Sequence, residues 1–115
     1  MERPTIVCLC GSTRFSQAFH DANLRETLAG RIVLSIGCDM RSDTEVFAHF
    51  SEHDLKHIKA SLDVLHYQKI DLADEVLILN VDGYIGESTM RELYYARARG
   101  KRVRFLVDVE EDGDA

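Results

Sequence analysis

Two polar segments, each following a short apolar run, contain the residues best suited to chemistry. The first segment follows the β-rich run Thr5–Cys10, and the second, Asn80–Glu92, follows the apolar run that begins at Glu75. The first segment consists of Gly11, Ser12, Thr13 and Arg14. A glycine turn, the backbone N–H groups of a helix start and an arginine charge can together hold a phosphate. An ordinary strand-to-helix turn, with Ser12 or Thr13 as N-cap, explains the same residues equally well.

Glu92 is the candidate nucleophile of the second segment. We expect it in the first turn of a helix that starts near Ser88 or Thr89 and ends at Gly100, where the helix dipole favours an ionised carboxylate. A charged carboxylate beside a pocket can attack an anomeric carbon and form a glycosyl ester. Thr89 and Glu92 also fit a capping box, in which the glutamate only satisfies a backbone donor, and the pattern alone favours that structural role.

Other side chains can contact a bound nucleotide, and each has a structural alternative. Asn80 and Asp82 end the apolar run, where they can hydrogen-bond a sugar or base, or cap the turn. Tyr67, with Phe47 and Phe50, can stack on a base, although aromatic residues at such spacings more often belong to the core.

No metal is predicted from the histidines and cysteines. The histidines that recur every four residues are His49, His53 and His57. They lack the spacing of a zinc motif, even with Asp54 or Cys38 added, so we interpret them as exposed or substrate-facing. Cys8 and Cys10 lie two apart in a predicted strand and therefore share a face. An odd number of cysteines without zinc-like spacing indicates free thiols in a reduced cytoplasm.

The elements that must position these residues alternate between strand and helix. The predicted strands are Thr5–Cys10, Arg31–Ile36, Glu75–Asn80 and Arg102–Val107, and the predicted helices are Phe15–Leu28, Glu52–Asp71 and the helix that ends at Gly100. Between the second strand and the second helix we expect a loop with a short helical piece from Glu45 to Phe50. This alternation predicts one doubly wound, mainly parallel α/β sheet of four to five strands, in flavodoxin-like order 2-1-3-4. The two polar loops would then face each other across one crevice.

Composition limits the partners that we expect. The chain has 115 residues and a net charge of −6, with five acids and no base in the last eight residues. We therefore predict one domain over residues 1–107 and an acidic tail over 108–115, and a near-neutral domain argues against nucleic-acid binding. No apolar run approaches the roughly 20 residues of a membrane span, and no signal peptide is recognisable. We expect a cytoplasmic protein without membrane contact.

Three motifs together resemble the nucleoside 2-deoxyribosyltransferase superfamily. They are Cys10–Arg14 after the first strand, Ala73–Val76 opening a later strand, and Gly86–Leu93. The superfamily includes deoxynucleoside 5′-monophosphate N-glycosidases and the pyrimidine monophosphate hydrolases of antibiotic pathways. The resemblance extends from about Ile6 to Leu106 and is strongest to the superfamily's uncharacterised branch. It implies an α/β fold, a small nucleotide or nucleoside as ligand, no cofactor, and a homodimer in which the Glu52–Asp71 helix is the expected contact surface.

The resemblance also assigns roles to individual residues. Glu92 matches the family's nucleophilic glutamate, Gly11–Arg14 matches the loop around the 5′-phosphate, and Ser88 matches a small hydroxyl residue near the same phosphate. Two positions depart from the family pattern. His66 stands where the family commonly has an aspartate that aids proton transfer, with Asp63 one turn earlier as a possible substitute, and Tyr94 replaces a glycine.

Three hypotheses remain open from the sequence. The first is cleavage or transfer of an N-glycosidic bond, with Glu92 attacking C1′ and His66 or a nearby acid assisting the leaving base. Water as acceptor would give a hydrolase, and a second base would give a transferase. The second hypothesis is a nucleotide-binding module without turnover, which the histidine at position 66 favours. A third, a structural or toxin–antitoxin-like accessory role, has no residue in its support.

Overall fold

The computed structural model describes residues 2–36 and 49–109. In chain order its elements are β1 (Ile6–Cys10), η1 (Thr13–Phe15), α1 (Ser16–Leu28), β2 (Ile32–Leu34), α3 (Glu52–Leu72), β3 (Glu75–Ile78), η2 (Val81–Gly83), α4 (Glu87–Ala98) and β4 (Arg102–Phe105). Every predicted strand and helix is present, and at least one end of each lies within two residues of its predicted position. The predicted helical piece at 45–50, except for its last two residues, lies outside the described residues, as do Cys38, Phe47 and most of the acidic tail.

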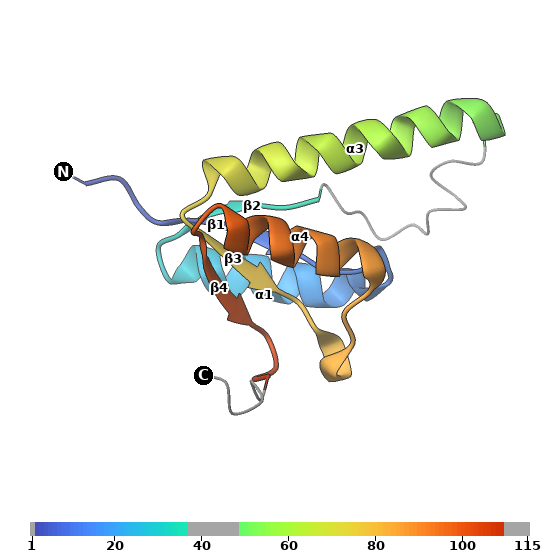
Figure 1. The fold of residues 1–115 in the computed structure, drawn as a ribbon. Helices are drawn as coiled ribbons and strands as arrows, with labels where there is room; N and C mark the ends of the chain where they lie inside the picture. Colours follow the sequence, from blue (N-terminus) through green and yellow to red (C-terminus); the bar gives the residue numbers. More distant parts are fainter. Residues whose placement is uncertain (1, 37–48, 110–115) are drawn as a thin grey trace.

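The four strands form one parallel sheet in the order β2-β1-β3-β4, which confirms the predicted fold class and strand order (Figure 1). β1 and β3 are central and pair in register, with Cys10 opposite Ile78. Both strands are covered on two faces, which explains why their sequences are continuous apolar runs rather than alternating ones. Because the strands are parallel, the loops that follow β1 and β3 leave the sheet at the same edge.

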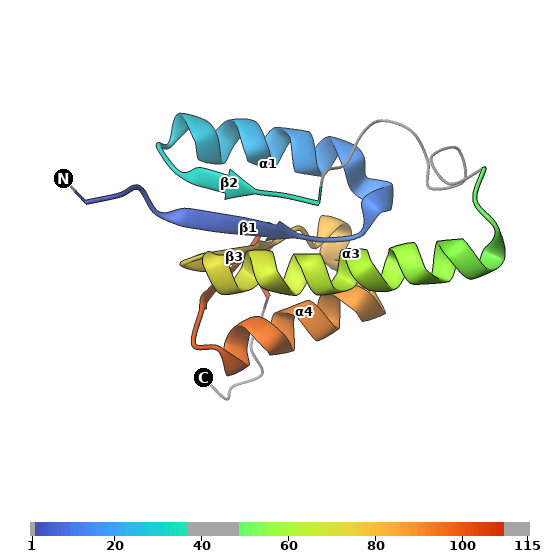
Figure 2. The same ribbon diagram turned by 90° about the horizontal axis from the view of Figure 1, so that it is seen from above.

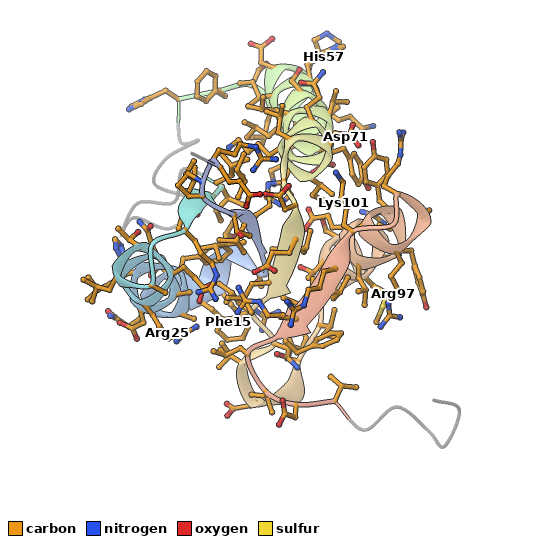
Figure 3. All side chains as sticks on the ribbon, turned by 90° about the vertical axis from the view of Figure 1, so that its left-hand side faces the viewer. Phe15, Arg25, His57, Asp71, Arg97 and Lys101 are labelled. Atoms are coloured by element: carbon orange, nitrogen blue, oxygen red, sulfur yellow. The ribbon has the colours of Figure 1, made fainter. Side chains whose placement is uncertain are left out.

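The helices cover the two faces of the sheet unequally. α1 lies on one face, and α3 and α4 lie on the other (Figure 2 and Figure 3). The chain crosses the sheet in one direction from β1 to β2 and in the opposite direction afterwards, so crossovers of a single hand place α1 apart from the other two helices. Along β1, Val7 and Leu9 therefore pack with α1, whereas Cys8 and Cys10 face α3 and α4.

Only the C-terminal half of α3 packs into the domain. Its buried residues are His66 and Ile70, and its first turns extend beyond the sheet (Figure 2). The helical spacing of Leu55, Ile58, Leu62, Leu65 and Ile70 predicts one apolar face for α3, but Leu62 and Leu65 are 47% and 45% exposed. In α1, the apolar stripe predicted from Phe15, Ala18, Phe19, Ala22 and Leu28 ends in an exposed Leu28. The apolar spacing predicted both helices, but not how far each one is covered by the sheet.

A charged cluster lies beneath α1, at the edge of the sheet where β3 and β4 begin. Arg104 of β4 donates to Glu75 of β3 at 3.0 Å and 2.7 Å and to Glu26 of α1. The two carboxylates are almost fully buried, and Arg31 adds weaker contacts to both at 3.5 Å and 3.7 Å. Buried carboxylates require such partners because an unpaired charge away from water is very costly. Within the described ranges, no helix has the length and apolarity to cross a bilayer.

Candidate functional site

The carboxyl group of Glu92 lies beside a buried group of two thiols and an imidazole. The Nε2 atom of His66 is 3.2 Å from the Sγ atom of Cys10, 3.8 Å from Sγ of Cys8 and 3.8 Å from Oε1 of Glu92. Cys10 and Glu92 are close enough to affect each other's pKa. Cys8 and Cys10 are fully buried, and the Glu92 side chain is 12% exposed. Glu92 is therefore the member of this group that a ligand can reach.

Three elements bring these side chains together. Cys8 and Cys10 are two residues apart on β1, so the pleat directs both toward the same face. His66 reaches that face from the packed half of α3, and Glu92 reaches the same face from α4. The prediction that the two cysteines are free thiols sharing a face is confirmed. Their partners lie 56 residues or more away in the chain, a separation that no local spacing reveals.

The last helix begins at Glu87, one residue before the expected start near Ser88, and this excludes the capping-box alternative for Thr89 and Glu92. α4 begins at Glu87 with Gly86 as N-cap, so Thr89 is buried inside the helix rather than capping it. Glu92 therefore lies in the second turn, where it does not complete a capping box and gains little from the helix dipole. The structure removes the capping role that the sequence pattern favoured for Glu92.

Burial raises the pKa of Glu92 to about 7, and the charges of Cys8 and Asp63 add to the increase. The charge of His66 and the hydrogen bond from Cys10 oppose it without cancelling it. Desolvation outweighs the stabilising contacts, so burial rather than the helix dipole determines the direction of this pKa shift.

The two thiols shift each other's pKa in opposite directions. The neighbouring thiol of Cys10 lowers the pKa of Cys8 to about 6, and His66 adds to this effect against the opposing effect of burial. The neighbouring thiol of Cys8, together with burial, raises the pKa of Cys10. Burial alone would lower the pKa of His66, but the hydrogen bond and charge of Cys8 and the charge of Glu92 outweigh it, so that this pKa is raised.

The two polar loops meet, as their strand order predicted. Arg14 donates to the hydroxyl group of Tyr84 at 2.8 Å and lies over the Tyr84 ring. Ser12 caps η1 by accepting from the Arg14 backbone at 3.4 Å, which is the structural alternative weighed for this turn. A Cβ atom on Gly11 would lie 3.1 Å from Leu79, so glycine permits the close approach of the two strand ends. The loop starts immediately after Cys10, which links it to Glu92.

The remaining predicted site residues lie in other surroundings. Asn80 is buried, and its amide exchanges two 2.9 Å hydrogen bonds with the backbone of Val107. Tyr67 is half-buried against Tyr95, as its core alternative implied. Asp82 is exposed in the η2 turn with a left-handed φ of 54°, a conformation that aspartate tolerates better than most residues. The structure thus gives Asn80 and Tyr67 structural roles and leaves Asp82 accessible.

Ser88 and Asp63 are both exposed near Glu92. Ser88 precedes Glu92 by four residues in α4, which places both residues on one face of the helix. Asp63 lies on α3, one turn before His66, close enough to raise the pKa of Glu92. Ser88 and Asp63 are therefore the described neighbours of Glu92 that are open to solvent.

The histidines singled out for a metal do not form a group of three. His53 and His57 contact each other in an edge-to-face arrangement, with ring centroids 4.6 Å apart, and both are exposed on α3. His57 points away from the sheet (Figure 3). A concavity of about 570 Å³ lies beside this part of α3. Its lining residues in the described part of the chain all belong to α3, and they include none of the strand ends that define the site around Glu92.

The sequence analysis missed the group formed by Cys8, Cys10 and His66. These are the residues of the described chain whose ligand atoms gather, all within 4.8 Å of one another. The signal was present in part, because two cysteines on one face of a central strand must meet whichever helix covers that face. The sequence did not indicate which histidine would meet the two cysteines, because α3 contains histidines at several positions.

Comparisons with protein-family models, with curated proteins and with solved structures found no match to this chain.

Proposed function

We propose that this protein cleaves or transfers the N-glycosidic bond of a nucleoside 5′-monophosphate, with Glu92 as the nucleophile. One observation carries the proposal. The Oε1 atom of Glu92 lies 3.8 Å from Nε2 of His66, which in turn lies 3.2 Å from Sγ of Cys10, the last residue of β1 before the Gly11–Arg14 loop. A carboxylate and a potential phosphate loop thus adjoin at the edge of a parallel sheet where α/β proteins bind ligands. The motif resemblance to nucleoside 2-deoxyribosyltransferases supports the same assignment.

In the proposed reaction a Glu92 oxygen attacks C1′, and the electrons of the C1′–N bond leave with the base. The base takes a proton, and the sugar becomes a glycosyl ester of Glu92. Water then releases the sugar phosphate, or the nitrogen of a second base replaces the first one. Glu92 is suited to the first step because a poorly solvated carboxylate has little water to lose before it attacks.

His66 acts indirectly in this proposal. Its ring is only 5% exposed, and its Nε2 atom faces Cys10, Cys8 and Glu92. It is therefore a positioning residue that holds Glu92 and shares a proton with it, rather than the acid that touches the leaving base. Asp63, which is exposed and electrostatically coupled to Glu92, is better placed to supply that proton.

The phosphate is assigned to Arg14, Ser12 and Ser88. The Arg14 guanidinium group is exposed and held by Tyr84 at the junction of the two loops. An arginine with free N–H groups can bind phosphate through two parallel hydrogen bonds. Ser88 lies one helical turn before Glu92, on the side of α4 where the helix begins. A ligand that reaches both residues would place its sugar close to Glu92.

A binding module without turnover is the second candidate, because the family's exposed aspartate is replaced here by a buried histidine. To separate the two candidates, we would incubate the full chain with nucleosides and their 5′-monophosphates and measure released base by chromatography. We expect base release from at least one monophosphate. Glu92→Gln should reduce it at least about a thousandfold while binding persists. The matched control, Glu87→Gln on the exposed first turn of α4, should retain it.

Ligand binding without release in the wild-type protein would favour the binding module. Neither binding nor release with any nucleotide would overturn both candidates.

We also propose that the protein forms a homodimer through α3. Leu62 and Leu65 are about half exposed on its outer surface, and an amphipathic helix normally buries such positions. Sedimentation analysis should give a dimer for the wild-type chain and a monomer for Leu62→Glu. A wild-type monomer at high concentration would contradict this assignment.

A further inference from the structure

We propose that Cys8, Cys10, His66 and Glu92 form a binding site for a divalent zinc-class cation. The site would have two sulfur ligands, one nitrogen ligand and one carboxylate oxygen. This inference goes beyond the proposed glycosidase activity and does not depend on it.

The distances fit the edges of a coordination tetrahedron. With Zn–S bonds of about 2.3 Å and Zn–N and Zn–O bonds of about 2.0 Å, neighbouring ligand atoms lie about 3.5 Å apart. The Nε2 atom of His66 lies 3.2 Å from Cys10, 3.8 Å from Cys8 and 3.8 Å from Glu92. The ligand atoms of Cys8, Cys10 and His66 all lie within 4.8 Å of one another. Three donor atoms thus surround one small volume, and Glu92 approaches it from the side of His66 as the proposed fourth ligand.

The hydrogen bonds of this group are poorly balanced without a cation. Two sulfur atoms and a carboxylate oxygen converge on one imidazole nitrogen, which can donate at most one hydrogen atom. The other ring nitrogen, Nδ1, has no hydrogen-bond partner among the described residues. A cation in the centre would accept a lone pair from each donor atom at once.

Burial and ligand type favour a soft divalent ion. Cys8, Cys10 and His66 are almost completely buried, as in closed structural sites, and the Glu92 side chain is the most exposed of the four. Thiolate and imidazole ligands select zinc over magnesium or calcium, which prefer oxygen.

Binding a cation here would occupy the carboxylate that the proposed glycosidase uses. The metal-bound and catalytically competent forms would therefore exclude each other. A chain saturated with Zn²⁺ would be stabilised but inactive. A metal-free chain would have Glu92 available for attack.

The test uses Co²⁺ as a spectroscopic probe of the full chain. The chain would carry Cys38→Ser, so that Cys8 and Cys10 are its only thiols. We expect one equivalent of Co²⁺ to produce thiolate-to-cobalt charge-transfer bands with the ligand-field bands of tetrahedral Co²⁺, and Zn²⁺ to abolish both. These bands require sulfur ligands and no substrate, so they report on the site whether or not the glycosidase proposal holds. Their absence from the folded, fully reduced chain at saturating Co²⁺ would overturn the inference.

Two variants separate this site from a surface histidine site. Cys10→Ser should weaken Co²⁺ binding about a hundredfold or more and remove most charge-transfer intensity. The double variant His53→Gln/His57→Gln removes the exposed imidazole pair on the same helix and should change neither property. The opposite pattern, with binding lost in the histidine variant and kept in Cys10→Ser, would overturn the site.

If circular dichroism shows that Cys10→Ser does not fold, Glu92→Gln decides the question. Glu92 is at the accessible side of the group, so this change should preserve the fold. We expect about tenfold weaker Co²⁺ binding with the charge-transfer bands retained, because both sulfur ligands remain. Unchanged affinity would contradict the four-ligand site.

Discussion

The Nε2 atom of His66 lies 3.8 Å from the Oε1 atom of Glu92, and Glu92 is the more exposed of the two side chains. Two residues that the sequence assigned separately as nucleophile and acid are therefore one unit with a single accessible end. His66 can affect a ligand only through the position and proton of Glu92. This arrangement distinguishes positioning from direct acid catalysis, and the two make different kinetic predictions.

We predict that His66→Gln lowers kcat about a hundredfold with KM changed less than about threefold. Glutamine cannot hold the Glu92 carboxyl group from the same side, and a displacement of about 1 Å is enough for such a loss. Steady-state kinetics on the monophosphate that releases its base would measure both constants. Asp63→Asn is the comparison for direct acid catalysis. If His66 protonated the leaving base directly, kcat of His66→Gln would fall more steeply than kcat of wild type as the base becomes a poorer leaving group.

We predict that Arg104→Met lowers the free energy of unfolding by about 3 kcal/mol. The change leaves Glu26 and Glu75 buried with the longer contacts of Arg25, Arg31 and Arg102, and breaking one side of a buried ion pair typically costs 3–5 kcal/mol. Urea denaturation followed by circular dichroism would give the value. A loss no larger than that of a surface pair would show that the cluster is solvated.

The matched control for this change is Arg102→Met. Arg102 is mostly exposed and lies 3.9 Å from Glu75, so its loss should cost less than about 1 kcal/mol. Replacing Glu26, Glu75 and Arg104 together with Gln, Gln and Met should recover much of the stability. This recovery is expected because the penalty arises from unpaired charge rather than from lost packing.

We predict that the ion pair between Arg3 and Asp74 makes stability depend on acid pH. Arg3 donates to both Asp74 oxygens, at 2.6 Å and 2.8 Å, and the Ile6 backbone N–H donates at 2.8 Å. The hydrogen bond from Arg3, followed by that from Ile6, holds the pKa of Asp74 well below its ordinary value. A depressed pKa contributes stability above the unfolded-state pKa of about 3.9, and this contribution disappears as pH falls toward the folded-state pKa.

Unfolding free energies of wild type and Asp74→Asn, measured from pH 7 to pH 2, would test this assignment. The difference between them should be constant above about pH 5 and should shrink below about pH 4. Glu87→Gln, which removes a solvent-exposed pair with Arg91, should show no comparable trend. A difference between wild type and Asp74→Asn that is independent of pH would mean that the ion pair does not contribute.

We predict that Gly11→Ala destabilises the protein by about 1–3 kcal/mol. Its new methyl group would lie 3.1 Å from the Leu79 Cβ atom, 3.3 Å from the Leu79 carbonyl oxygen and 3.4 Å from Phe19. Gly86→Ala is the control, because its methyl group would meet chiefly the Tyr84 hydroxyl at 3.2 Å, on a half-exposed side chain that can move. Thermal denaturation should show a clear loss for the first variant and almost none for the second. Equal effects would contradict the close approach of the strand ends.

The sequence was sufficient to predict the architecture but not the depth at which each side chain lies. Apolar runs and helical spacing predicted β1, β3, α1 and α3, and the strand order followed from the alternation of elements. The extent of helix packing depends on tertiary contacts, which is why Leu62, Leu65 and Leu28 were expected inside and lie outside. Periodicity predicts which face of a helix is apolar, but not whether another element reaches it.

The site was predictable where topology determined it and unpredictable where burial did. The meeting of the loops after β1 and β3 followed from parallel strands that end at one edge, and Arg14 and Tyr84 make that contact. The raised pKa of Glu92 did not follow. Glu92 lies in the second turn of α4, away from the helix dipole, and burial is the main cause of the shift. The cluster of Cys8, Cys10 and His66 depended on which turn of α3 crosses β1, a distance that no sequence pattern records.

Asn80 has a consequence for how this protein could change over evolution. Its side-chain amide hydrogen-bonds to the backbone of Val107 in the way that a paired backbone residue would. The ends of β3 and β4 therefore remain joined beyond their last strand pair, Ile78 with Phe105. The turn that begins at Val81 is therefore attached to an already closed edge and contributes nothing to its closure. Insertions or substitutions between Val81 and Ile85 could reshape the entrance for a different ligand, while the sheet beneath remained as it is.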